Sequence, residues 1–137
     1  MAETVRTICD ACYNEVDAPV VAVCETIDVR GVSVTDEFWY PICPLCGNRI
    51  GHAATMDRNF EKMYAAYREA RDVPRPDEIV ALRRRYGFSQ RVLAAILGIG
   101  VASVQRYEGG ALPSESHAEL LRQARVPQVL RERLRSG

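Results

Sequence analysis

Residues 87–110 read GFSQRVLAAILGIGVASVQRYEGG, and this stretch decides the fold of the C-terminal half of the chain. Ser89 is a favourable N-cap for a first short helix. The apolar face of that helix is expected to serve only for packing: Val92, Leu93, Ile96 and Leu97. A tight turn at Gly98-Ile99-Gly100 leads into a second helix over Val101–Tyr107, which Gly109-Gly110 ends. The pattern therefore predicts two short helices joined by a tight turn.

This stretch resembles the helix-turn-helix of lambda-repressor-like domains. The resemblance implies that the second helix enters the major groove of DNA by its N-terminal half and that the first helix crosses the DNA backbone. Ala94 lets the two helices approach closely, while Ile99, Val104 and Tyr107 are expected to anchor the second helix in the core. The positions left to contact DNA are Gln90, Arg91, Val101, Ala102, Ser103, Gln105 and Arg106.

The chemistry of these side chains suggests their roles on DNA. Arg106 has the fork geometry that pairs with O6 and N7 of guanine, a contact worth ~1–3 kcal/mol of discrimination. Gln90 is expected to meet phosphate or a base edge, whereas Ala102 offers only apolar contact. Two alternatives stay open at this stage. Arg106 could bridge to a carboxylate of a neighbouring helix, and Gln105 could simply face solvent.

Charge is distributed unevenly along the 137 residues, although the formal net charge is zero. Residues 1–74 carry seven Lys/Arg and twelve Asp/Glu (7 − 12 = −5), and residues 75–137 carry eleven and six (11 − 6 = +5). A basic half attracts phosphate backbones. No apolar run approaches the roughly 20 residues that span a bilayer, and no apolar signal-peptide core is present, so a cytoplasmic protein without a membrane partner is expected.

Four of the five cysteines form two C-x-x-C pairs, Cys9/Cys12 and Cys43/Cys46. Two cysteines separated by two residues can bind one zinc ion from a single turn, and two such turns complete a tetrahedral shell. The pairs flank a stretch rich in β-branched residues that predicts a hairpin, with strands at about 20–29 and 32–40 and a turn at Arg30-Gly31. One structural Zn²⁺ per chain follows, because four thiolates leave no open position for water.

Other interpretations of the cysteines and histidines are weaker. Unrelated buried or redox-active cysteine turns remain the alternative to zinc. A zinc deaminase needs an H-x-E motif, which neither His52 nor His117 begins, and a thioredoxin-like enzyme needs one C-x-x-C in a βαβ pattern. We therefore expect no enzyme. Cys24 is expected to face inward from its strand, His52 is a weak candidate to replace one thiolate, and His117 is expected to be a surface or packing residue.

The remaining pattern divides the chain into parts. An amphipathic helix is predicted over 57–70 from apolar residues at helical spacing: Phe60, Met63, Tyr64 and Tyr67. Val73-Pro74-Arg75-Pro76 then breaks it. Further short helices are predicted over 77–86, 114–125 and 128–135. The expected fold is α+β: a zinc-binding β module (1–54), a connecting helix and linker (55–74), and an all-α lambda-repressor-like domain for DNA binding and dimerisation (75–137).

The string from Ser89 to Gly98 resembles the S-Q-x-x-L-A-x-x-L-G segment of lambda-repressor-like domains, and Val101–Gly110 resembles their recognition helix. Together with the cysteine pairs, nearly the whole chain is similar to the YgiT/MqsA family of zinc finger/helix-turn-helix antitoxins. It also resembles the N-terminal part of proteins with a SocA-like (Panacea) domain. Antitoxins of the MqsA type read bases with an Asn and an Arg. Arg106 matches the Arg, but Ala102 replaces the Asn, so a different operator is expected.

This resemblance implies a homodimeric repressor that binds a palindromic operator of its own operon, and an acidic zinc module that binds a cognate toxin. The expected dimer surface comprises Leu120, Leu121, Val129, Leu130 and Leu134. One alternative function is a toxin-sequestering protein in which DNA binding is secondary. Another is a stand-alone regulator with no toxin.

Overall fold

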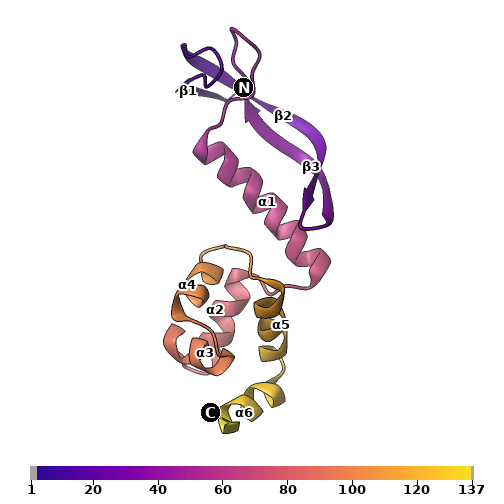
Figure 1. Cartoon of the computed structure of the whole chain (residues 1–137), viewed down its shortest axis with the longest axis vertical. Coiled ribbons are helices and arrows are strands. Elements are labelled where there is room, and N and C mark those ends of the chain that lie inside the picture. The colour runs from indigo at the N-terminus through magenta and orange to yellow at the C-terminus, as the bar shows by residue number, and fades with distance from the viewer. Residues whose placement is uncertain (1–2, 137) are drawn as a thin grey trace. The chain divides into compact units, whose positions relative to one another are not determined.

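A computed structural model describes residues 3–136 of the chain, which divides into two compact units, Met1–Ala66 and Tyr67–Gly137. The first unit is built on an antiparallel sheet of strand order β1-β2-β3 (Figure 1). Its strands are β1 (Thr4–Ile8), β2 (Glu15–Val29) and β3 (Val32–Pro41). The α+β class and the N-terminal hairpin are confirmed. Strand β1 was not predicted, and β2 begins five residues before the expected position 20.

The turn of the hairpin is set by two residues with positive φ. Arg30 has φ 49° and Gly31 has φ 87°, the backbone that a two-residue turn needs if it is to match the twist of its strands. Register then runs without a bulge from Val29 opposite Val32 to Val20 opposite Pro41. The predicted turn at Arg30-Gly31 is thus in place.

Helix α1 (Ala53–Arg71) follows the sheet and begins four residues before the predicted position 57. Its start is fixed by His52, whose carbonyl accepts from the Met56 N–H (2.9 Å) and whose Nδ1 hydrogen-bonds Thr55 Oγ1 (2.9 Å). Four buried residues of the helix recur every four positions, Thr55, Asn59, Met63 and Tyr67, and Arg68 near its end is buried as well. Phe60, expected on the apolar face, is instead 38% exposed and stacks on Tyr64.

Asn59 joins α1 to the outer edge of β3. Its side-chain oxygen accepts from the Trp39 N–H (2.9 Å), and its amide nitrogen donates to the Trp39 carbonyl (2.8 Å). The cations of Arg58 and Lys62 lie over the Trp39 ring, 3.9 and 4.5 Å from its centroid. A buried polar side chain therefore takes the place of a further strand at this point of the edge.

The second unit contains the end of α1 and five short helices: α2 (Pro76–Arg85), α3 (Gln90–Leu97), α4 (Val101–Glu108), α5 (Glu115–Ala124) and α6 (Pro127–Ser136). Ser89 caps α3 by accepting from the Val92 N–H at 3.1 Å, as predicted. Gly98 ends α3 in the left-handed conformation, with φ 74°. These caps place α3 and α4 on either side of a tight turn.

The core of this unit forms where the helices meet, and its large buried side chains include Leu93, Leu97, Val104, Tyr107, Leu121 and Leu130. Ala94 is buried between helices, and Ile99 packs against the core, as expected. His117 packs as expected too, with Nδ1 2.5 Å from Tyr107 Oη. Val92 departs from the prediction, because it is 43% exposed rather than buried. No helix in the described part of the chain is long and apolar enough to cross a membrane.

The segment after α1 is held within the second unit by Arg122 of α5 and by Arg125, which follows that helix. Arg122 donates to the carbonyls of Arg71 (2.9 Å) and Asp72 (3.0 Å). The Asp72 carboxylate pairs with Arg125 at 2.8 Å, and Val73 is buried. The helix break at the predicted prolines is confirmed, but the segment is anchored. The proposed three-part division, with borders at residues 54 and 74, stays a prediction.

Candidate metal centre and nucleic-acid interface

The Sγ atoms of Cys9, Cys12, Cys43 and Cys46 all lie within 4.8 Å of one another. Cys9 and Cys46 are 3.6 Å apart at sulfur, and Cys12 and Cys43 are 3.7 Å apart. Those separations are far longer than a disulfide, at roughly 2.05 Å. They agree with four thiolates at about 2.3 Å from a common centre, the tetrahedral shell of zinc. The donor set and its spacing fit a structural Zn²⁺.

The two C-x-x-C turns have the same backbone design. In the first, Cys9 accepts at its carbonyl from the Tyr13 N–H (2.9 Å) and donates to the Asn14 carbonyl (3.0 Å). In the second, Cys43 makes the equivalent bonds with Gly47 (2.9 Å) and Asn48 (2.9 Å). The residue after the second cysteine has positive φ in both turns: 62° at Tyr13 and 77° at Gly47. Each knuckle therefore presents its sulfurs from one tight turn.

Polar groups around the first knuckle lower the pKa values of the Cys9 and Cys12 thiols, chiefly through backbone N–H groups. The Ala11 and Cys12 N–H groups point to Cys9 Sγ at 3.4 and 3.5 Å. Asn14 lowers the pKa of the Cys12 thiol to about 6, chiefly through its backbone N–H. The pKa of Cys46 is raised to about 12, because the lowering by the Asn48 N–H is outweighed by burial and by the neighbouring sulfurs. Four thiolates so close together need a cation to neutralise them.

Two other predictions about this unit can be judged. His52 hydrogen-bonds Thr55 and does not belong to the four-sulfur cluster, so the alternative of a histidine ligand is wrong. Cys24 is exposed, so the prediction that it faces inward is also wrong. It shares the exposed face of β2 with Thr26 and Asp28, whereas Val23 and Ile27 on the other face are partly buried.

In the second unit, α3 and α4 carry the predicted DNA-contacting residues. The side chains of Arg91, Ala102, Gln105 and Arg106 are exposed, and those of Gln90, Val101 and Ser103 are half-buried. Val101 packs partly against the core, which limits the apolar contact it can offer. Arg106 donates to Ser103 Oγ at 3.3 Å. No ion pair joins Arg106 to a carboxylate among residues 3–136, which removes the alternative of a bridge to a neighbouring helix.

Glu108 is a residue whose role was not predicted from the sequence. Its carboxylate lies at the end of α4, where it accepts from Arg83 Nη2 (2.9 Å) and Nε (3.1 Å) and from Gln90 Nε2 (3.4 Å). Arg83 also donates to the Phe88 carbonyl at 3.3 Å. One carboxylate thus links α2, the start of α3 and the end of α4, and it fixes the side chain of a predicted DNA contact. In the sequence, Glu108 contributes only to the resemblance with the recognition helix. The signal that could have indicated its role is a carboxylate at the end of a helix expected to contact DNA.

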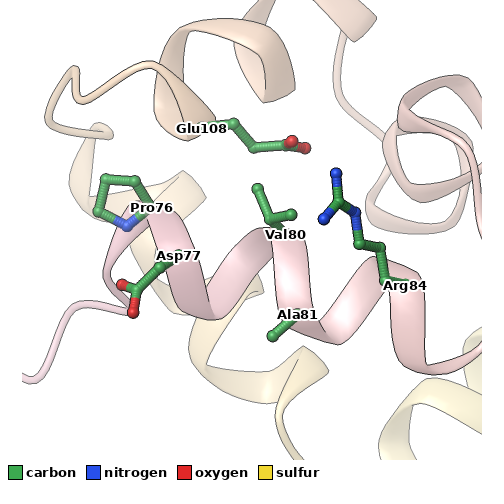
Figure 2. A pocket seen from close by; sticks show the side chains of 6 residues that line it. All are labelled: Pro76, Asp77, Val80, Ala81, Arg84 and Glu108. Atoms are coloured by element: carbon green, nitrogen blue, oxygen red, sulfur yellow. The ribbon is translucent and has the colours of Figure 1, made fainter.

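A groove of about 640 Å³ lies beside this network, lined by Pro76, Asp77, Val80, Ala81, Arg84 and Glu108 (Figure 2). Figure 2 shows that five of these side chains come from α2, with Val80 between Glu108 and the helix. The carboxylate of Glu108 is already held by Arg83 and Gln90. The groove therefore lies where α2 and α4 pack, and it is distinct from the exposed side chains of α3 and α4 that the sequence predicts to contact DNA.

A four-thiolate cluster followed by this helix pair defines a zinc-binding helix-turn-helix protein. Residues 8–135 match the family model described as MqsA, the antitoxin component of a bacterial toxin-antitoxin system. Because the match spans nearly the whole chain, the chain belongs to the MqsA antitoxin family, as the sequence predicted. No curated protein matches the sequence significantly. Membership identifies an antitoxin, a class of regulator rather than of enzyme, whose partners in general are a toxin and DNA.

Proposed function

We propose that the chain is a dimeric, sequence-specific DNA-binding repressor that acts in the cytoplasm on its own operon, as the antitoxin of a type II toxin-antitoxin system. The support is the helix pair α3–α4, capped by Ser89 and Gly98, within a half of the chain with a net charge of +5. In such a pair the second helix reads the major groove. Family membership supplies the antitoxin role.

The observation that carries this proposal is the exposed guanidinium of Arg106. It lies exposed on α4 with Ser103 as its hydrogen-bond partner, and no carboxylate of residues 3–136 forms an ion pair with it. A free guanidinium in this place can donate two hydrogen bonds to guanine. Gln105, Ser103 and Ala102 complete the proposed base-facing surface, with a lesser share for Val101. Gln90 and Arg91 would position the domain on phosphates.

A dimer would place two copies of α4 about 34 Å apart on one face of a palindromic operator. The expected dimer surface needs correction, because Leu121 and Leu130 are each only 2% exposed and belong to the core. Leu134 stays available at 47% exposure, and Val126 joins it at 48%. These two side chains are the better candidates for contact between copies.

Fluorescence anisotropy on DNA from just upstream of the gene tests the proposal, at two salt concentrations and with a scrambled duplex beside it. Arg106→Ala is expected to lose about 1–3 kcal/mol of discrimination. Arg131→Ala is the matched control, since it removes one exposed charge from α6 and should weaken binding to every duplex alike. Binding that ignores sequence in the wild type would refute a sequence-reading repressor.

A second candidate function is supported by the charge of the zinc unit. Residues 1–66 carry five Lys/Arg and ten Asp/Glu (5 − 10 = −5), an acidic surface suited to a basic protein. In this proposal the zinc unit binds the toxin, and the toxin is sequestered whether or not DNA is bound. Co-expression with the protein of the neighbouring reading frame tests it. Growth rescue by a chain carrying Arg106→Ala would show that neutralisation does not need DNA reading.

A further inference from the structure

The two edges of the hairpin differ in how their outward-facing backbone groups are bonded. On β3, the outward backbone groups of Trp39 are both bonded to Asn59, and the Glu37 carbonyl accepts from Lys62 Nζ at 2.8 Å. The same lysine pairs with Asp36 at 3.0 Å. Side chains of α1 thus cover much of this edge.

On β2, strand β1 covers only residues 15–19, and Val20 donates to the Glu3 carbonyl at 2.8 Å. That bond fixes the direction of every later backbone group, because successive residues of a strand alternate and the register with β3 has no bulge. Odd positions from Val21 to Val29 face β3. The N–H and C=O groups that face away, with no described strand beside them, belong to Ala22, Cys24, Thr26 and Asp28. We call these four residues the open edge of β2.

The open edge has neither the lysine nor the proline that commonly block an edge strand, and the only charges in residues 20–29 are acidic, at Glu25 and Asp28. Residues 20–29 read VVAVCETIDV, with no lysine, arginine or proline, and the side chains of all four open-edge residues are exposed. A long edge strand without lysine, proline or a bulge can template pairing with another strand. Proteins use such edges for β-augmentation, in which main-chain bonds supply affinity.

We propose that the open edge of β2 is the docking site for a strand of the toxin, which adds antiparallel to β2 beside β1 and extends the sheet. The inference rests on the proposed toxin-binding role of the zinc unit. The flanking charges are acidic, with Glu25 and Asp28 on β2 and Asp36 and Glu37 on β3, in a unit of net charge −5. The partner strand is therefore one flanked by lysine or arginine.

Thr26 and Thr35 offer a matched pair of variants. They lie opposite each other, their hydroxyls share a hydrogen bond of 2.7 Å, and each has an outward-facing N–H on its own edge. Thr26→Pro and Thr35→Pro both lose that hydroxyl pair and one outward N–H, but only Thr26→Pro alters the open edge. Zinc content and Trp39 fluorescence report whether each variant keeps its fold.

Binding of the full-length chain to the purified protein of the neighbouring reading frame is measured by calorimetry. Thr26→Pro is expected to weaken the complex at least tenfold, and Thr35→Pro less than twofold. Equal affinity for both variants would overturn the edge assignment and leave the toxin partnership intact. No complex with the wild-type chain, and no rescue of growth, would overturn the proposed function and this inference with it.

Amide hydrogen exchange gives an independent readout that does not depend on a variant folding. The amides of Ala22, Cys24, Thr26 and Asp28 should exchange fast in the free chain and slow at least tenfold in the complex. Those of Val23 and Ile27, which face β3, should be protected in both states. Fast exchange at the open edge in the complex would refute the inference. Slow exchange in the free chain, lost on dilution, would assign the edge to a second copy instead.

Discussion

Arg83 and Glu108 form a two-pronged ion pair, with Nη2–Oε1 at 2.9 Å and Nε–Oε2 at 3.1 Å. Their side chains are only 16% and 8% exposed, which makes this the least exposed ion pair described in residues 3–136. The pKa of Arg83 is raised, first by its hydrogen bond to Glu108. Since Glu108 also holds Gln90, the pair links the stability of the helical unit to the proposed DNA contact.

Replacement of Glu108 by Gln should lower the free energy of unfolding of the helical unit by about 2–3 kcal/mol. Removing one partner of a fully buried pair costs roughly 3–5 kcal/mol, and the residual exposure of Arg83 reduces that figure. Urea denaturation followed by circular dichroism measures it. DNA affinity should fall as well, because the amide has a single acceptor oxygen and cannot hold Arg83 and Gln90 together as the carboxylate does.

The control for this variant is Glu115→Gln, which loses a contact to Arg122 from a carboxylate that is 71% exposed. A change of at most about 0.5 kcal/mol is expected there. Similar losses in the two variants would show that the Arg83–Glu108 pair has no special weight.

The sequence predicted the helices and the metal ligands because both depend on local signals. Ser89 and Gly98 set the start and the end of α3 whatever the helix packs against. The C-x-x-C spacing identifies the metal ligands without any tertiary information. Strand β1 was not predicted because Thr4–Ile8 is only five residues long and pairs with β2 across the first knuckle.

Which side of an element is buried could not be predicted in the same way. The two-residue alternation of a strand correctly places Cys24 and Val23 on opposite faces of β2. Which of these faces is covered depends on where α1 lies. Phe60 and Val92 fit helical periodicity, yet each lies at the margin of its apolar face, where the neighbouring elements decide exposure. The contacts of Glu108 join three helices, and no local pattern contains them.

Zinc removal should unfold the N-terminal unit selectively. Metal binding supplies folding free energy to small thiolate modules, whereas the helical unit has a core of its own. A chelator, or Cys43→Ser, is expected to abolish the zinc content of one ion per chain and to shift the fluorescence of the single tryptophan, Trp39. Helical circular dichroism should fall only in part.

Cys24→Ser is the control for the zinc experiment, since Cys24 is exposed and outside the cluster. It should keep one zinc per chain and the wild-type fluorescence. Loss of metal from this variant would mean that the four-cysteine assignment is wrong.

Asp72 should contribute an acid-sensitive part of the stability of the helical unit. The Arg125 guanidinium holds the pKa of this carboxyl below its usual 3.8, through a hydrogen bond and through charge. A lowered pKa stabilises the fold above pH 3.8 and loses that effect as pH falls through the folded value. The difference in free energy of unfolding between wild type and Asp72→Asn should therefore be present at pH 7 and shrink below pH 3.8. Asparagine tolerates the φ of 52° at this position, so backbone strain stays unchanged.

Denaturant titrations at pH 7, 5 and 3 measure this difference. Glu61→Gln is the control, because Glu61 is an exposed carboxylate on α1. A difference for Asp72→Asn that stays constant down to pH 3 would rule out the carboxylate as its source.

Tyr13 and Gly47 occupy equivalent positions in the two knuckles, and exchanging their residue types should have opposite effects. Tyr13 holds φ at 62° with a side chain that is 80% exposed, so it has left-handed strain and little packing to offset it. That conformation costs a non-glycine residue roughly 1–2 kcal/mol. Glycine relieves this strain, but it also raises the entropy of the unfolded chain, which offsets part of the stabilisation. Tyr13→Gly should raise the stability of the zinc unit by up to about 1 kcal/mol.

Gly47→Ala should lower the stability of the zinc unit by about 1 kcal/mol or more, because φ is 77° at this position. The loss is expected even though a Cβ there would meet no atom within 4 Å. Urea denaturation followed by Trp39 fluorescence, at saturating zinc, compares the two variants. If Tyr13→Gly is destabilising, the exposed ring contributes contacts that outweigh the strain, and the equivalence of the two knuckles does not extend to energy.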